Sequence, residues 1–255
     1  MALQPHENGG TDHRLPVRDG RDQRRQVSGE GPGYQLLPRT TEPEDRTVSR
    51  IYDITQPIRS GIPVWPGDTD YAEQRVWAID ASCPVNVSRL TLSTHTGTHA
   101  DAPLHYDAGG LPIGAVDLDL YLGPALVLHL PPGLNRVESG HLAGRVPTGT
   151  RRLLLRTYDR FPQDVWDSDF TAIGADTIDS LAGQGVRLIG VDAPSLDPQS
   201  SKTMDAHMAV RRHGMAILEG LVLDDVPEGM FELIALPLRL ATADAAPVRA
   251  ILRSL

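Results

Sequence analysis

Cysteine is almost missing from this 255-residue chain, which contains only Cys83. A single cysteine cannot form an intrachain disulfide, and it excludes the thiolate-rich zinc sites that need several cysteines. No group near Cys83 in the sequence would lower the pKa of its thiol. We therefore expect Cys83 to be a buried, inert side chain rather than a nucleophile.

Long apolar runs and an excess of positive charge are also missing. No apolar run approaches the roughly 20 residues that span a bilayer, and the N-terminus lacks the apolar core of a secretory signal. The formal net charge is -9 at pH 7, which disfavours nucleic acid and anionic membrane surfaces as partners. These absences leave a soluble, cytoplasmic protein as the expectation.

Residues 1–48 contain few large apolar side chains and show no periodic pattern. Such a segment cannot bury enough apolar surface to offset the entropy lost on ordering. We therefore predict a disordered N-terminal extension over residues 1–48 and one folded domain over residues 49–255.

The second half of the chain indicates the fold class. Residues 153–155 form a continuous leucine run, which is typical of a strand covered on both faces. A short helix predicted over residues 176–183 precedes a strand over residues 186–191, and this order forms an α/β unit. We predict a single α/β domain with a mixed β-sheet core and flanking helices.

The richest chemistry lies in residues 95–105, where three histidines and one aspartate occur at alternate positions. In an extended chain alternate side chains share one face. The neighbouring threonines favour a strand, and Gly97 and Pro103 disfavour a helix interior. The pattern predicts an extended segment that carries four polar groups on one face: His95, His99, Asp101 and His105.

These residue types suit a catalytic metal ion. Imidazole and carboxylate ligands without thiolates favour Zn2+ or Mn2+. His95, His99 and Asp101 would give one ion three protein ligands and leave a position for water. His105 is either a further ligand or a general acid/base, because Pro103 bends the chain before it and imidazole titrates near ~6.5.

Three residues outside this segment are also candidates. Glu219 lies in an apolar stretch, where a carboxylate is costly unless it is paired or bound to a metal; a salt bridge to Arg211 or Arg212 is the alternative. If Glu219 and His207 approached Asp101, that carboxylate could bridge two ions. Trp65 lies between prolines in a loop and is either a core residue or the wall of a pocket.

The segment resembles the signature of the cyclase family of metal-dependent hydrolases, through His95-x-Gly97-Thr98-His99-x-Asp101-x-Pro103-x-His105. Shorter motifs resemble the bacterial kynurenine formamidases of that family. They are Trp65-Pro66-Gly67-Asp68, Cys83-Pro84-Val85-Asn86, Leu104-His105-Tyr106, Ser195-Leu196-Asp197-Pro198, Lys202-Thr203-Met204-Asp205-Ala206-His207 and Leu218-Glu219-Gly220-Leu221. The resemblance runs from about residue 50 to the end and implies the swivelling β/β/α fold of the family.

The resemblance also implies a function. It implies a homodimer that hydrolyses the linear amide of N-formyl-L-kynurenine to L-kynurenine and formate, in tryptophan degradation. It implies two Zn2+ ions per subunit bridged by Asp101, His105 as the proton donor and acceptor, and Trp65 against the substrate. The implied ligands are His95, His99 and Asp101 for the first ion, and Asp101, His207 and Glu219 for the second. Two alternatives remain, namely a related amide or lactam hydrolase such as one that opens isatin, and a non-catalytic metal-binding module.

Overall fold

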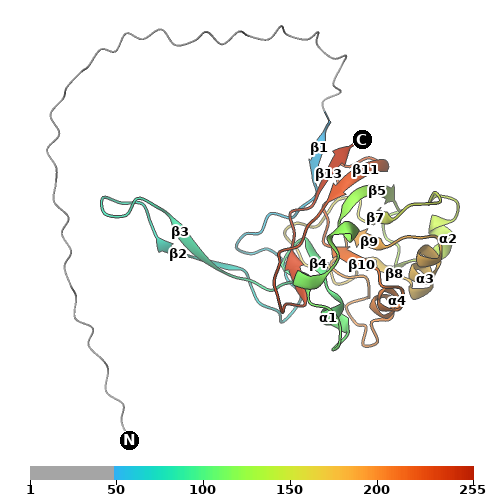
Figure 1. The fold of residues 1–255 in the computed structure, drawn as a ribbon, viewed down its shortest axis with the longest axis horizontal. Helices are drawn as coiled ribbons and strands as arrows, with labels where there is room; N and C mark the ends of the chain where they lie inside the picture. Colours follow the sequence, from blue (N-terminus) through green and yellow to red (C-terminus); the bar gives the residue numbers. More distant parts are fainter. Residues whose placement is uncertain (1–48) are drawn as a thin grey trace, which may run out of the picture. The chain divides into compact units, whose positions relative to one another are not determined.

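The computed structural model describes residues 49–255. The predicted disordered extension over residues 1–48 therefore lies outside the described residues. Within the described part, no helix is long and apolar enough to cross a membrane. The predicted fold class is confirmed, because one mixed β-sheet organises these residues and helices pack against it (Figure 1).

The main sheet has nine strands in the order β1-β13-β11-β5-β7-β9-β10-β4-β12. Its central strands, β5, β7, β9 and β10, run parallel, and the strands on either side of them pair antiparallel. The strand bounds are β1 Ile51–Asp53, β4 His99–Asp101, β5 Leu122–His129, β7 Arg152–Arg156, β9 Leu188–Val191, β10 Ala216–Glu219, β11 Gly229–Ile234, β12 Ala245–Pro247 and β13 Ile251–Ser254.

The helices are short. They are α1 Pro103–Tyr106, α2 Ser139–Leu142, α3 Ala175–Gly183 and α4 Asp205–His213, with two 3-10 turns at Ile113–Ala115 and Leu118–Leu120. Two small sheets complete the fold: the hairpin of β2 Ala72–Trp77 with β3 Val87–Thr91, and the parallel pair of β6 Arg136–Val137 with β8 Ala172–Ile173.

The central leucine run contributes to two hydrophobic cores, one on each face of the sheet. All three leucines of the run are fully buried, and alternation sends Leu154 to one face and its two neighbours to the other. The face that receives Leu153 and Leu155 is covered by α3 and α4, through residues such as Ile178 and Val210. On the opposite face Leu154 packs among side chains of the outer strands, so the sheet curls over its own core.

The prediction for residues 95–105 is wrong in its local structure. Only His99–Asp101 form a strand, because Gly97 lies in a bend at φ +68° and ends the extended run before His99. Pro103 begins α1 instead of bending an extended chain, since proline is well tolerated in the first turn of a helix. The histidines at the two ends of the segment therefore do not belong to one extended face.

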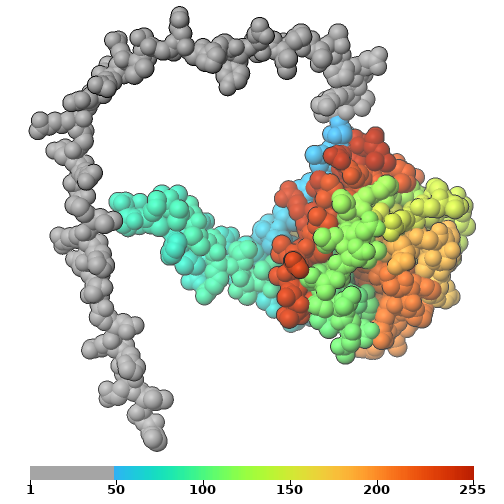
Figure 2. All heavy atoms as spheres, viewed as in Figure 1, coloured from blue at the N-terminus to red at the C-terminus, as the bar shows by residue number. Residues whose placement is uncertain are grey.

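The β2–β3 hairpin, hereafter the arm, projects away from the main sheet (Figures 1 and 2). All six residues of β2 are exposed, and so are four of the five residues of β3. Cys83 lies in the turn of the arm with an intermediate exposure, so the prediction of a buried thiol is wrong. A two-stranded ribbon has no interior of its own in which to bury it.

Candidate active site

Sheet pairing brings Glu219 to the histidine segment. Strand β4 lies between β10 and β12, and its register places His99 opposite Glu219 and Asp101 opposite Ile217. Residues opposite each other in an antiparallel pair point to the same face, as do residues two apart in one strand. His99, Asp101 and Glu219 therefore share a face, although Glu219 lies 120 positions after His99 in the sequence.

The bend before β4 sets the orientation of His99. Thr98 donates a hydrogen bond through Oγ1 to the carbonyl of Gly220 at 2.6 Å, which ties the bend to the end of β10. Nδ1 of His99 lies 2.9 Å from the Gly97 carbonyl, an acceptor, so that nitrogen carries the proton. Nε2 is left facing the carboxylates, at 3.4 Å from Asp101 Oδ1 and 3.4 Å from Glu219 Oε2.

His207 reaches the same point from the first turn of α4. Asp197 accepts the backbone N–H groups of Ala206 and His207 at 3.0 Å each and lies 2.6 Å from His207 Nδ1. This carboxylate therefore supports the start of the helix and orients the ring. His207 Nε2 then lies 3.4 Å from Asp101 Oδ2 and 3.7 Å from Glu219 Oε1.

The alternative partners proposed for Glu219 are engaged elsewhere. Arg211 pairs with Asp107 and Arg212 with Asp179, both on the surface. Oε1 of Glu219 accepts the backbone N–H of Leu196 at 2.9 Å, and its side chain is almost fully buried. Glu219 is therefore part of the histidine and carboxylate cluster and not of a surface salt bridge.

The buried polar atoms fit a metal ion. Among the described residues, both carboxylate oxygens of Asp101 and Nε2 of His99 are buried without a hydrogen-bond partner. Buried polar groups are normally paired, and ligation is one way to pair them. Ligand atoms of His95, His99 and Asp101 lie within 4.8 Å of one another, and so do those of Asp101, His105 and His207.

The charges of the cluster show what a cation would replace. Burial lowers the pKa of His99, but the nearby carboxylates of Asp101 and Glu219 outweigh burial and raise that pKa to about 10. For His207, burial is likewise outweighed by Asp101 and Asp197, and its pKa also rises to about 10. Burial raises the pKa of Asp101, but the three histidines around it hold that pKa well below its usual range. Without a cation, protons on the imidazoles balance the carboxylates, and a bound metal would displace them.

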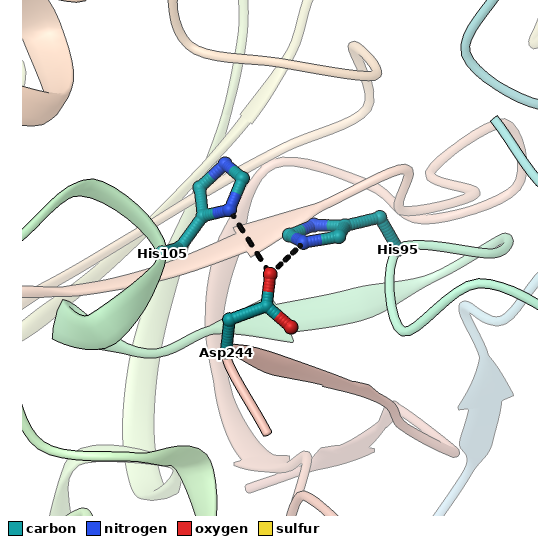
Figure 3. Close-up of side chains that lie close together, drawn as sticks. All are labelled: His95, His105 and Asp244. Atoms are coloured by element: carbon teal, nitrogen blue, oxygen red, sulfur yellow. Dashed lines mark hydrogen bonds and ion pairs between the residues drawn. The ribbon is translucent and has the colours of Figure 1, made fainter. Parts of the chain in front are cut away.

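A further carboxylate, Asp244, was not found by sequence reasoning. Its Oδ2 lies 3.0 Å from His95 Nε2 and 3.4 Å from His105 Nδ1 (Figure 3). The other ring nitrogen of His95 lies 3.1 Å from Asp101 Oδ1. Burial raises the pKa of Asp244, but hydrogen bonds from His95 and Thr94 outweigh burial and lower it to about 2. The only sequence signal was an acidic residue in a run of small residues just before an unpredicted strand, β12.

The histidines of the cluster and Glu219 line a cavity of about 540 Å³. One wall is aromatic: Trp65 packs edge-to-face on Trp166 with ring centroids 5.5 Å apart, and Tyr158 and Phe161 also line the cavity. Trp65 thus lines a pocket, and it also contacts the buried Phe170 at 6.4 Å. Both interpretations of Trp65 from the sequence describe part of its environment, whereas Trp166 was not predicted.

The fold and the site define a class: an α/β protein with a candidate metal centre of the histidine and carboxylate type used in hydrolysis. The sequence model of the Cyclase family matches residues 52–198. The chain belongs to the Cyclase family.

Solved structures agree with this assignment. One described as a potential metal-dependent hydrolase with cyclase activity is 31% identical, with a TM-score of 0.70 over 82% of this chain and 99% of that one. A predicted metal-dependent hydrolase from Bacillus stearothermophilus is 30% identical, with a TM-score of 0.70 over 82% of this chain and all of that one (100%). Isatin hydrolase A from Labrenzia aggregata shares the fold at 20% identity, with a TM-score of 0.69 over 81% of this chain and 94% of that one.

Proposed function

We propose that this protein is a metal-dependent amidase that hydrolyses N-formyl-L-kynurenine to L-kynurenine and formate. The observation that carries the proposal is the cluster of His95, His99, Asp101, His207 and Glu219, all buried except the partly exposed His95, next to an aromatic-walled cavity. His105 lines the same cavity, as a proton-transfer group would need to.

We propose two Zn2+ ions per subunit, with Asp101 as the bridging ligand. The two oxygens of Asp101 face different histidines: Oδ1 faces His95 and His99, whereas Oδ2 faces His207. Glu219 is divided in the same way, with Oε2 toward His99 and Oε1 toward His207. Two carboxylates that each present one oxygen to either side suit a pair of ions better than a single ion.

The chemistry supplied by the bound metal would be Lewis acidity toward the formyl oxygen and a lowered pKa of the attacking water. His105 would take the proton of that water and return it to the aniline nitrogen, which is a poor leaving group until it is protonated. Trp65 and Trp166 would hold the aryl ring by stacking and exclude water from one side of it.

Two acidic residues of the cavity lining suit one group of this substrate that a lactam such as isatin lacks. Asp68 and Asp167 line the cavity, and their carboxylates would pair with the α-ammonium group of N-formylkynurenine, whereas isatin carries no cation. The α-carboxylate of the same substrate would need a partner other than lysine or arginine, because neither is among the described residues of the lining. Isatin opening remains the second candidate because isatin hydrolases share the fold.

The test couples metal analysis with product analysis on the purified protein. We expect about two zinc ions per subunit, and formate release from N-formyl-L-kynurenine that stops on chelation and returns with Zn2+. Ring opening of isatin without formate release would replace the formamidase proposal with the lactam alternative. Tight binding of aryl amides without turnover would favour a non-catalytic metal-binding module.

We further propose a homodimer in which the arm of each copy packs on the other copy. The arm exposes large apolar side chains, among them Trp77 at 57% and Ile79 at 63%. The main body exposes a second apolar group, hereafter the leucine patch, formed by Leu111, Leu118, Leu122, Leu236, Leu238 and Leu240. A hydrogen bond from the Gly114 N–H to the Leu240 carbonyl joins the two segments of this patch.

A second copy of the chain is the binding partner that fits both the arm and the leucine patch. Every copy carries one arm and one patch, so a two-fold pair covers both at once. The arm spans residues 72–91, and with the leucine patch it approaches the roughly 20–30 residues per side of a stable interface.

We also propose a cytoplasmic location. The lack of a second cysteine is consistent with it.

A further inference from the structure

Asp244 is held in place independently of the histidines that it contacts. It immediately precedes β12, and its backbone carbonyl accepts the N–H of Ala102 at 2.8 Å. Thr94 Oγ1 donates to Oδ1 of the carboxylate at 2.9 Å. With Oδ1 occupied, Oδ2 is the oxygen that faces His95 and His105 (Figure 3).

This contact determines which ring nitrogens carry protons. An ionised carboxylate only accepts hydrogen bonds, so His95 Nε2 and His105 Nδ1 must both be donors. In a neutral imidazole, which is the form that binds a metal, the other nitrogen then carries a lone pair. For His95 the free nitrogen is Nδ1, which lies 3.1 Å from Asp101 Oδ1 in the candidate metal centre. For His105 it is Nε2, which is left as the proton acceptor of a ring that lines the cavity.

We propose that Asp244 is a positioning residue that sets the tautomers of His95 and His105 through one carboxylate oxygen. It thereby prepares one ring to bind the metal and the other to accept a proton from water. The role in catalysis rests on the proposed hydrolytic function, whereas the tautomers are a property of the metal-loaded protein whatever its substrate. Asp244 itself contacts the imidazole rings of His95 and His105 and acts on the reacting atoms only through them.

The competing role for Asp244 is that of a metal ligand. Its carboxylate, His95 and His105 offer atoms within 4.8 Å of one another and could hold a separate ion. That ion would compete with the protons that the positioning role requires on His95 Nε2 and His105 Nδ1. The two roles therefore predict opposite protonation of the same nitrogens and a different metal count.

The first test is NMR of the histidine ring nitrogens in the 15N-labelled, zinc-loaded protein, with His105 assigned by comparison with His105→Gln. We expect the Nδ1–H tautomer at His105, which is the minor form of free neutral imidazole in water. We expect His105 to revert to Nε2–H in Asp244→Ala. An Nε2–H tautomer at His105 in the unmodified protein would overturn the proposal without reference to any activity.

The second test is kinetic, on whichever substrate the unmodified protein turns over. We expect Asp244→Ala to lower kcat about 10–100-fold, because loss of the hydrogen-bond partner of a metal-ligating histidine has an effect of this size. We expect little change in KM and about the same number of zinc ions per subunit. Asp244→Asn keeps an acceptor oxygen and should recover part of kcat. Loss of one zinc ion per subunit in Asp244→Ala would identify a ligand instead, and an unchanged kcat would remove the positioning role.

The matched control is Asp179→Asn. Asp179 is exposed to the same degree as Asp244, at 40% against 41%, and it also contacts a histidine, His213, at 2.8 Å. It lies on α3, outside the cavity lining. We expect Asp179→Asn to leave kcat, zinc content and the spectrum of His105 unchanged, and a loss of kcat equal to that of Asp244→Ala would attribute the effect to general destabilisation.

Discussion

Replacing Glu219 with glutamine tests the candidate metal centre directly. Oε1 accepts the N–H of Leu196 at 2.9 Å, and the carbonyl oxygen of glutamine can keep that bond. The change therefore removes a negative charge from between His99 and His207 with little loss of packing. In the metal-free protein we expect a lower melting temperature, because Glu219 is one of the carboxylates that keep the buried His99 imidazole protonated. The quantity to compare is therefore the rise in melting temperature that Zn2+ produces in each variant.

The expected effect on metal binding follows from linkage. Loss of a hydrogen-bond partner of a metal ligand weakens metal binding by about 10–100-fold. Loss of a charged ligand itself should therefore weaken metal binding by at least about 100-fold. A cation at ~1,000 times its Kd stabilises a protein by about 4.1 kcal/mol, and at ~10 times its Kd by about 1.4 kcal/mol. The difference of roughly 2.7 kcal/mol lowers the melting temperature of a domain of this size by roughly 5–11 °C.

The assay compares melting temperatures with chelator and with excess Zn2+, together with zinc content after dialysis. We expect Glu219→Gln to lose most of the rise in melting temperature that Zn2+ produces in the unmodified protein. After dialysis we expect it to retain one zinc ion better than the other. Glu228→Gln is the matched control, because the exposed Glu228 also accepts a backbone N–H, from His129 at 2.7 Å. An equal zinc-dependent rise in Glu219→Gln and the unmodified protein would remove Glu219 from the metal centre.

Four further predictions test other parts of the structure. His105→Ala should keep its zinc but lose about 10²–10⁴-fold in kcat, and loss of metal would identify a ligand instead. Burial raises the pKa of Asp192 from 3.8 to about 6 despite four hydrogen bonds from residues 157 and 158. The folded protein therefore favours the protonated carboxyl of Asp192, and this contribution to stability is fully present below pH 3.8 and is lost as pH rises through about 6. The free energy of unfolding should fall over this pH window in the unmodified protein, and Asp192→Asn should lack that fall. Trp77→Glu should convert the proposed dimer to a monomer in light scattering, whereas an unchanged mass would place the interface elsewhere. Deleting residues 1–48 should leave formate release intact, because every candidate site residue lies beyond them, and a large loss would refute the expectation of a dispensable extension.

The sequence predicted which residues meet better than it predicted how they meet. The alternation of His95, His99 and Asp101 correctly suggested a cluster, although a bend and a strand build it and not one extended segment. Glu219 could be proposed because a carboxylate in an apolar stretch needs a partner, whereas His207 was proposed mainly through the resemblance to the cyclase family. Their approach to Asp101 depends on the register of β10 against β4, which no local pattern encodes.

Asp244 could not be found in the same way. It is partly exposed and lies in a run of small residues, so neither burial nor periodicity distinguishes it from a surface aspartate. Its importance comes from contacts with residues about 140–150 positions earlier in the chain. The strands predicted at residues 153–155 and 186–191 lie close to β7 and β9 because continuous apolar runs are local signals, whereas β12 was missed because its three residues show no such signal.

The pairing of β1 with β13 has a consequence for how the protein is made. Ile51 lies opposite Arg253, two residues from the C-terminus, and β12 covers the strand that carries His99 and Asp101. A ribosome delivers the chain from its N-terminus, so β1 must wait for the residues of β13 and β4 must wait for those of β12. The sheet therefore closes, and the candidate metal centre gains its neighbours Asp244 and β12, only after the segments that carry the candidate ligands have been made. Nascent chains that have not reached Asp244 would hold those ligands without the carboxylate that contacts His95 and His105.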